Sequence, residues 1–487
     1  MNVFHQVSKK SMRNVVACNA PAARRLQILQ LSVVLLAWPA TVARAQAPRA
    51  LQHASDPVSI EIGPGIIPLN GPWKFRVGDD PRWSDPHFDD SAWESVDLTP
   101  PPGAHDSDVG LKGYVPGWMS RGHREYRGFA WYRMLIYLTA PSRDTLSLAG
   151  PLEVDNAYEL FVNGQRLGAS GDFSRAVPVA YNTRPSMFVL PTPLSPAPSA
   201  NRDAYVVAIR TWMEPGTGAV PPDAGGMHIA PAIGILSEIR ARHQVEWTEK
   251  VLGYVVEVAE PISFMILAVM ALSLLMFDRS AIAYIWLTVA LVLLAMSRAN
   301  QALFFWTTVE SEHVYDLVRN VLLVPLLLGA WTLVWHAWVR RDRPTWMPYA
   351  IGALTLLYLV SQWCGRPWLA PSLPDRLIVS AHSVSNYLRL LFVATSIVIV
   401  SRGISRDRRV GLLVLPSVLL VSAGLYAQEL SNLGVPGIWF PFGVGVSRTQ
   451  FAFAAFDVFM FVELFRRLAE FAWRTRASAG VASGTVR

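Results

Sequence analysis

Carboxylate pairs and histidines are the residues of the first half whose types could support catalysis. Asp89 and Asp90 are adjacent, and Glu153 and Glu159 form a spaced pair; glycoside hydrolysis needs two carboxyl groups at a set separation. Asp89 and Asp90 are more simply a turn, in which aspartates cap their own backbone. The histidines show no metal-ligand spacing. They are His87, His105, His123 and His228. We therefore expect no enzyme activity, no catalytic residue, no metal and no cofactor.

A loop-like segment over residues 113–123 offers groups for ligand binding instead. It contains Trp118, Arg121 and His123, and Trp131 follows it. Apolar walls with a few placed polar groups suit a sugar, which has an apolar face and polar edges. The alternative is that Trp118 and Trp131 belong to the protein core, since tryptophan is highly buried on average.

Charged and titratable side chains also interrupt the apolar stretches of the second half. Such groups are costly in lipid and are commonly functional. We expect Arg389 and Asp457 to pair, because they fall near the same depth. For the other residues we consider three alternatives. They form a water-accessible ligand pocket, a proton or ion relay, or structural ion pairs such as Arg319 with Glu429. The full set is Glu257, Glu260, Arg319, His382, Arg389, Glu429 and Asp457.

The apolar stretches themselves predict seven membrane-spanning helices. Each is close to the length of about 20 residues that crosses a bilayer. They are residues 251–277, 281–303, 314–338, 346–364, 377–400, 410–431 and 449–467. Arginines gather in alternate loops and after the last stretch, so the positive-inside rule places the region before residue 251 outside the cell membrane and the C-terminus in the cytoplasm.

The composition agrees with a membrane protein. The chain has 487 residues, of which 52% are hydrophobic and only 16% charged, whereas soluble domains average about 25% charged residues. The net charge of +7 comes largely from the loop arginines, so nucleic acid is not an expected partner. The two cysteines are Cys18 and Cys364; with Cys18 removed on export, no internal disulfide can form.

Residues 1–45 predict a cleavable signal peptide. Arg24 and Arg25 precede a mainly apolar run over residues 26–38, and Ala43-Arg44-Ala45 has the form of a cleavage site. The run is shorter than the roughly 20 residues of a comfortable span. The alternative is an uncleaved membrane anchor.

Residues 50–240 change to short alternating runs broken by proline, glycine and aspartate. Period-two runs such as 73–77, 132–138 and 205–212 predict an antiparallel β-sandwich. Asn163-Gly164 predicts a hairpin, because a type I′ turn needs positive φ at both central residues. We expect a polar stalk over residues 241–250 and a short basic tail over residues 468–487.

The order of several motifs in this region resembles a known family. The motifs are Leu69-Asn70-Gly71-Pro72-Trp73, Phe88-Asp89-Asp90-Ser91-Ala92-Trp93, Tyr126-Arg127-Gly128-Phe129-Ala130-Trp131-Tyr132 and Tyr158-Glu159-Leu160-Phe161-Val162-Asn163-Gly164. They are similar to the sugar-binding jelly-roll domain of family 2 glycoside hydrolases, a galactose-binding-like fold. In that family the domain usually accompanies a catalytic barrel, which has no counterpart here.

A sandwich followed by seven spans resembles the bacterial seven-transmembrane receptors with diverse intracellular signalling modules. That resemblance implies a sensor that binds a ligand outside and signals to a kinase, cyclase or phosphatase inside. Few residues follow residue 467, so we expect the effector to be a separate cytoplasmic protein. The predicted fold is an exported all-β sandwich, a galactose-binding-like jelly roll, followed by an all-α seven-helix transmembrane domain.

The predicted function is therefore that of a sensor in the bacterial inner membrane, with a periplasmic N-terminal domain. Its expected partners are membrane lipid, a carbohydrate or related ligand and the cytoplasmic effector. One alternative is a transporter or membrane accessory protein that uses the outer polar cluster. Another is a surface scaffold that does not switch.

Overall fold

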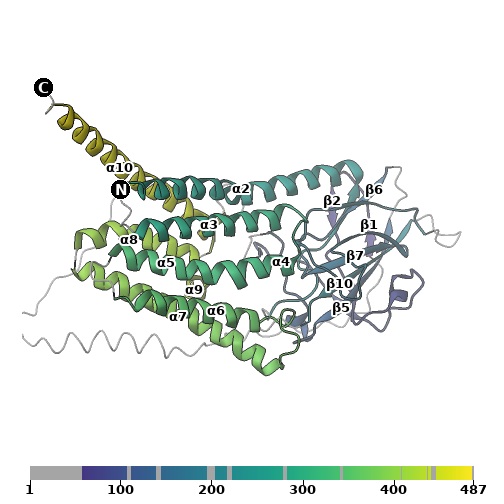
Figure 1. The fold of residues 1–487 in the computed structure, drawn as a ribbon. Coiled ribbons are helices and arrows are strands. Elements are labelled where there is room, and N and C mark those ends of the chain that lie inside the picture. The colour runs from purple at the N-terminus through teal and green to yellow at the C-terminus, as the bar shows by residue number, and fades with distance from the viewer. Residues whose placement is uncertain are drawn as a thin grey trace, which may run out of the picture. The chain divides into compact units, whose positions relative to one another are not determined.

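The alternating runs of the first half form two β-sheets with a shared core (Figure 1). The larger sheet has the order β4-β3-β5-β10-β7-β8, with β1 parallel to β5, and the smaller has the order β2-β11-β6-β9. The strands are β1 (Val58–Ile60), β2 (Ile66–Pro68), β3 (Trp73–Val77), β4 (Glu94–Val96), β5 (Gly128–Leu138), β6 (Leu146–Ala149), β7 (Ala157–Val162), β8 (Gln165–Ser170), β9 (Met187–Val189), β10 (Ala204–Met213) and β11 (Ala232–Ile235).

The computed structural model describes residues 58–106, 111–138, 144–194, 203–215, 222–277, 282–339, 344–406, 408–435, 437–439 and 446–484. The predicted signal peptide over residues 1–45 lies outside these ranges. Residues Leu51–Arg487 form one compact unit.

The central strand β5 shows why the sheets pack as they do. Successive side chains of a strand point to opposite faces. Tyr132 and Ile136 are buried in the core that the two sheets share, whereas Trp131 is buried on the opposite face against Trp83 and Trp93. Both faces of the larger sheet are therefore covered in this region.

The Asn163-Gly164 hairpin is confirmed. Val162 of β7 pairs with Gln165 of β8, and the two residues between them have φ of 53° and 80°. Positive φ at both positions is what a type I′ turn requires.

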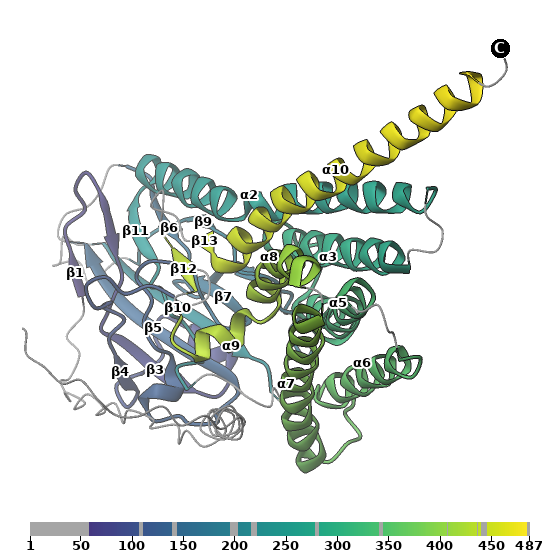
Figure 2. The same ribbon diagram turned by 90° about the vertical axis from the view of Figure 1, so that its left-hand side faces the viewer.

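Each of the seven predicted spans is helical in the structure. The helical segments are α2 (Leu236–Leu274), α3 (Ile282–Trp306), α4 (Glu312–Asp316), the π-helical η3 (Leu317–Leu323), α5 (Val324–Val339), α6 (Met347–Cys364), α7 (Asp375–Arg406), α8 (Arg408–Leu425), α9 (Ala427–Asn432) and α10 (Arg448–Gly484). A two-stranded ribbon of β12 (Ile438–Trp439) and β13 (Val446–Ser447) precedes α10 (Figure 2).

Four helical stretches in the described ranges are long and apolar enough to cross a membrane. They are Leu236–Leu274, Ile282–Trp306, Glu312–Trp338 and Asp375–Ser405. The chain therefore has the character of a membrane protein. The count of seven spans stays a prediction.

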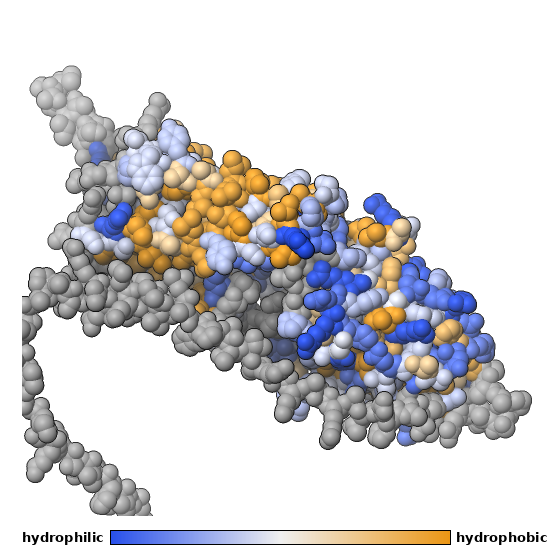
Figure 3. Space-filling model, turned by 90° about the horizontal axis from the view of Figure 1, so that it is seen from below, coloured by the Kyte–Doolittle hydropathy of each residue, from blue (hydrophilic) through white to orange (hydrophobic). Residues whose placement is uncertain are grey.

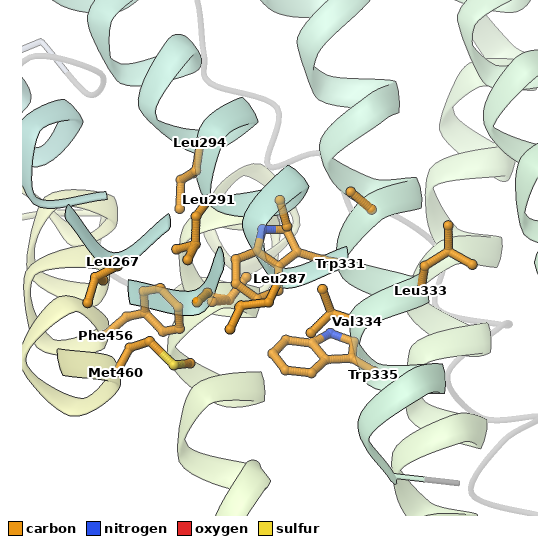
Figure 4. Packing of buried hydrophobic residues seen from close by; sticks show 14 of the residues in the cluster. Leu267, Leu287, Leu291, Leu294, Trp331, Leu333, Val334, Trp335, Phe456 and Met460 are labelled. Carbon is orange, nitrogen blue, oxygen red and sulfur yellow. The ribbon is translucent and has the colours of Figure 1, made fainter. Parts of the chain in front are cut away.

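The helices share an apolar core of their own. Figure 4 shows Trp331 and Trp335 of α5 near Phe456 and Met460 of α10 and Leu291 of α3. The ring of Trp331 meets the ring of Phe456 edge-on at 5.4 Å, a favourable aromatic geometry. Interdigitation of this kind fixes the helices against one another.

Apolar side chains also cover the outside of the helices. On the face in Figure 3, hydrophobic residues gather over the helices and hydrophilic residues over the sheets. Ile262 is 63% exposed and Val458 is 68% exposed. Soluble proteins rarely expose large contiguous apolar patches, so this surface suits lipid.

Candidate functional site

The first membrane-capable helix begins inside the core of the sandwich. β11 ends at Ile235 and α2 begins at Leu236, whose backbone N–H donates to the Thr145 carbonyl at 2.8 Å. Ile239, in the first turn of α2, is fully buried in a cluster with Ala149 and Ala232 of the smaller sheet. Residues 241–250, the predicted stalk, are thus continuous helix between the sandwich and the apolar part of α2.

A second connection runs through α4, at the entrance to the third predicted span. The side-chain amide of Asn156 donates to Glu312 Oε2 at 2.6 Å, and the Glu312 N–H donates to the Ala180 carbonyl at 2.9 Å. His313 Nε2 lies 2.5 Å from Glu214 Oε1. The His313 ring also stacks on Trp368, with centroids 4.4 Å apart.

A third connection joins α2 to a sandwich loop. Lys250 Nζ donates to Asn182 Oδ1 at 2.6 Å and to the Thr183 carbonyl at 2.7 Å. Hydrogen bonds from a charged donor are stronger than neutral ones. The loop around residues 180–183 is therefore bound both by α2 and, through Ala180, by α4.

The predicted ligand-binding tryptophans lie in the protein core. Trp118 and Trp131 are each 1% exposed. Trp118 Nε1 donates to the Tyr126 carbonyl at 3.1 Å, and Trp131 Nε1 donates to Asp79 Oδ1 at 3.0 Å. Neither ring offers a free face for a sugar, which matches the core alternative.

Arg121 and His123 lie closer to the surface, and both are partly buried. His123 Nε2 is 3.0 Å from Glu94 Oε2, and its ring packs edge-on against Phe75. Burial lowers the pKa of the Arg121 guanidinium. A ligand-binding role for these two residues stays a prediction.

Three of the four carboxylates considered for catalysis have structural partners. Asp89 Oδ1 accepts the Ser91 N–H at 3.0 Å, as in the expected turn. Asp90 accepts from the buried Arg133 at 2.8 Å. Glu159 accepts from Arg166 and Arg210, each at 2.7 Å. Carboxylates engaged in turns and ion pairs of this kind are typical of a structural framework rather than of an acid–base pair.

Glu153 differs, because the groups that act on its charge are other titratable side chains, among them Asp106, His228 and Asp155. Burial, and then the negative charge of Asp106, raise its pKa from the ordinary 4.5 to about 8. Nearby, His228 Nε2 lies 3.0 Å from Asp155, and Tyr114 stacks parallel to the imidazole at 4.6 Å. Burial opposes the charge on His228, but the contact with Asp155 outweighs it, so the pKa of His228 is raised.

Two of the predicted intramembrane residues meet in one buried cluster. Arg298 of α3 donates to Glu257 at 2.9 Å and to Glu260 at 2.5 Å, and Gln450 of α10 donates to Glu257 at 3.3 Å. All four side chains are buried. The prediction from sequence missed Arg298, although a single arginine inside the expected span 281–303 was a signal for it.

The expected pairing of Arg389 with Asp457 is wrong. Arg389 donates to both carboxylate oxygens of Glu429, and Asp457 accepts from Ser263 at 2.5 Å. The example pair of Arg319 with Glu429 is wrong as well, since Arg319 donates to the Tyr315 hydroxyl at 2.7 Å.

Depth in the membrane does not decide which helices are neighbours. α10, with Asp457, packs on α2 and α8, whereas α7, with Arg389, packs on α5, α6 and α8. His382 lies partly buried in the first half of α7. The seven predicted residues therefore form several separate groups instead of one pocket.

Two carboxylates share one guanidinium in the buried cluster around Arg298, and Asp457 of α10 lies beside Ser263 of α2. Glu257 Oε2, Glu260 Oε1 and Asp457 Oδ1 are buried and have no hydrogen-bond partner among the described residues. An uncompensated buried carboxylate is costly unless it takes up a proton or a cation. The cluster could therefore exchange a proton as well as fix three helices.

Solved structures that are similar to this chain match a small part of it. No protein-family model matches it, and no curated protein is significantly similar. A calcium-binding mutant of β-glucuronidase 2 from Bacteroides uniformis is 20% identical, with a TM-score of 0.22, over 34% of this chain and 17% of its own. A glycosyl hydrolase family 2 member from Bacteroides cellulosilyticus is 17% identical, with a TM-score of 0.23, over 35% of this chain and 20% of its own.

The chain thus spans at most 20% of the length of these two glycosidases. Both are similar to a small N-terminal part of it, the β-sheet region, which a region of membrane-capable helices follows.

Proposed function

We propose that the chain is a membrane sensor whose β-sandwich binds a carbohydrate or related ligand outside the membrane. Its seven helices span the bacterial inner membrane and pass the conformational change caused by ligand binding to a separate cytoplasmic protein. The observation that supports this best is the burial of Ile239 of α2 in the sandwich core. A helix that starts within the ligand-binding domain transmits a displacement, whereas a flexible linker would absorb it.

The contacts of α4 and Lys250 add to this argument. Together with the start of α2, they tie sandwich loops to the entrances of two membrane-capable helices. A ligand shifts such a system only if it binds two arrangements with different affinity. A difference in ligand affinity between the two arrangements would arise at the sandwich loops that α2 and α4 both contact.

The carbohydrate assignment comes from the resemblance of the sandwich motifs to the sugar-binding domain of family 2 glycoside hydrolases. The β-sheet region and its glycosidase neighbours are compatible with that assignment. The orientation, with the sandwich in the periplasm and the C-terminus in the cytoplasm, comes from the arginine-rich loops.

The experiment is hydrogen–deuterium exchange of the full chain in lipid nanodiscs, after a thermal-shift screen against carbohydrates. With a carbohydrate hit bound, we expect altered amide exchange in the sandwich and also in residues 312–316 and in α2. Changes confined to the sandwich would identify a binding scaffold that does not switch. The absence of any carbohydrate hit would contradict the proposed ligand class.

A second candidate function is proton- or ion-coupled transport. The observation that favours it is the excess of buried carboxylates around Arg298. Ion-coupled flux in proteoliposomes that is lost in Glu257→Gln and kept in Glu463→Gln would support transport. Glu463 is a suitable control because its carboxylate pairs with Arg466 and Arg467 near the end of the bundle.

A further inference from the structure

A pocket of about 620 Å³ lies between the larger sheet, the loop that precedes β9 and the first turns of α2. Small-molecule sites typically have volumes of roughly 300–1,000 Å³. Among the residues that line it are Tyr158, Tyr181, Arg184, Ser186, His243 and Trp247. The sandwich and α2 both contribute walls, so an occupant would touch both.

Arg184 carries a positive charge that no described lining residue of this pocket balances. Arg184 is partly buried, and no hydrogen bond or ion pair satisfies its guanidinium within the described part of the chain. None of the described lining residues is acidic. Lys250, which binds the adjacent Asn182, adds a second cation nearby. A planar guanidinium without a partner matches a carboxylate, which it binds through two parallel hydrogen bonds.

The remaining groups suit a ligand with several hydroxyls. Ser186 is partly exposed, and the Oη of the buried Tyr158 lies 2.9 Å from Ser186 Oγ and fixes its position. Gly150 lets this pair approach the sheet, because a Cβ there would come within 2.2 Å of Ser186 Oγ and 2.6 Å of Tyr158 Oη. Hydroxyl groups both donate and accept, so they match the edges of a sugar.

Aromatic rings supply the apolar part of the pocket. Trp247 Nε1 donates to His243 Nε2 at 3.2 Å, which fixes both rings on one face of α2. In the neutral imidazole this contact leaves Nδ1 to carry the proton. Tyr181 adds a third ring from the loop. Aromatic faces of this kind pack against the apolar face of a sugar ring.

We propose that this pocket binds a hydroxylated carboxylate of mono- or disaccharide size, such as a hexuronate. Arg184 receives the carboxylate, Ser186, whose hydroxyl is held by the buried Tyr158, bonds a hydroxyl of the ligand, and Trp247 packs against the ring. The site rests on the proposed sensor function and deepens it, because its occupant links the loop to α2. It also moves the expected site away from the 113–123 loop.

The test is calorimetric titration of the full chain in nanodiscs with galacturonate and glucuronate. Galactose and glucose are the matched neutral sugars, and inorganic phosphate tests for general anion binding. We expect saturable uronate binding. The affinity for the neutral sugars, and the affinity of Arg184→Ala for uronate, should each be about tenfold or more weaker, since one charge-assisted pair contributes that much. Arg175→Ala is the control, because Arg175 is an exposed arginine of the same loop.

Several results would overturn the proposal. They are the absence of uronate binding, equal binding of galactose, tighter binding of phosphate, or uronate binding that Arg184→Ala leaves unchanged. Thermal unfolding of Arg184→Ala and partial rescue by Arg184→Lys separate loss of the site from loss of the fold.

The same samples distinguish failure of the site from failure of the sensor. Uronate binding that depends on Arg184 without altered exchange in α2 keeps the pocket and contradicts the sensor. A neutral sugar that alters exchange in α2 independently of Arg184 keeps the sensor and contradicts the pocket.

Discussion

Asn156 and Glu312, which are 156 positions apart in sequence, join the sandwich to α4 through a hydrogen bond of 2.6 Å. The same Asn156 side chain accepts the backbone N–H of Glu214 at 2.8 Å, and the Glu214 carboxylate contacts His313, the neighbour of Glu312. The four residues therefore close a ring of polar contacts. Polar networks of this kind are stable only when each member is satisfied.

Breaking that ring should lower stability in a cooperative way. Asn156 has a φ of 61°, so Asn156→Gly removes the side chain without adding backbone strain. We expect a loss of about 1–3 kcal/mol, because Glu312 loses its partner. In a double-mutant cycle with Glu312→Ala, denaturant unfolding in detergent should show non-additivity of at least about 0.5 kcal/mol. Additive effects would mean that the two side chains do not interact.

The pKa of Glu153 predicts a pH dependence of the sandwich. Burial and Asp106 raise the pKa to about 8, against the opposing charges of His228 and Lys250. Between pH 4.5 and 8 Glu153 therefore holds its proton in the folded chain and releases it in the unfolded chain, so its contribution to the free energy of unfolding falls as pH rises.

We expect Glu153→Gln to reduce that slope when unfolding is followed by tryptophan fluorescence across the same pH range. The exposed Glu61→Gln is the matched control. A slope that is the same in Glu153→Gln and in the unmodified chain would refute this assignment.

Trp118→Ala should act on the fold and not specifically on a ligand. The side chain is buried against Phe75 and Tyr126, and removing a buried tryptophan typically costs about 3–5 kcal/mol. Thermal unfolding should show this loss, with a smaller loss for Trp118→Phe. A stable Trp118→Ala variant that selectively loses a ligand would instead support the 113–123 loop as a binding site.

The cluster around Arg298 predicts a rescue experiment. Arg298→Ala leaves Glu257 and Glu260 buried without their cation, which typically costs about 3–5 kcal/mol. Arg298→Met combined with Glu257→Gln and Glu260→Gln removes all three charges and should restore folded yield, measured by size-exclusion chromatography in detergent. Restored yield with lost proton flux would favour the transport function over a packing role.

The sequence predicted those features that depend on local pattern. The Asn163-Gly164 turn follows from the need for positive φ, and the helical segments follow from long apolar runs. Trp118 and Trp131 were ambiguous, because an aromatic residue suits a core and a sugar site equally well. Strand alternation alone could not decide this, since both faces of β5 are covered.

The pairing of intramembrane charges could not be predicted in the same way. Depth follows from position along a span, but rotation about the helix axis and the order of neighbouring helices depend on tertiary packing. Arg389 accordingly pairs with Glu429 of α9. The pocket beside Trp247 was equally inaccessible, because its walls come from segments far apart in the chain.

In the proposed sensor, α2 transmits a conformational change in the sandwich to the membrane helices. Thr248 and Glu249 are exposed residues of α2 just beyond the pocket. Two glycines there weaken the helix by about 1 kcal/mol each relative to alanine. The most direct measurement compares Thr248→Gly/Glu249→Gly with Thr248→Ala/Glu249→Ala by ligand-dependent amide exchange in nanodiscs.

Both variants should bind the ligand, and only the alanine pair should show altered exchange in α2 beyond residue 251. Equal transmission through the glycine pair would contradict the account.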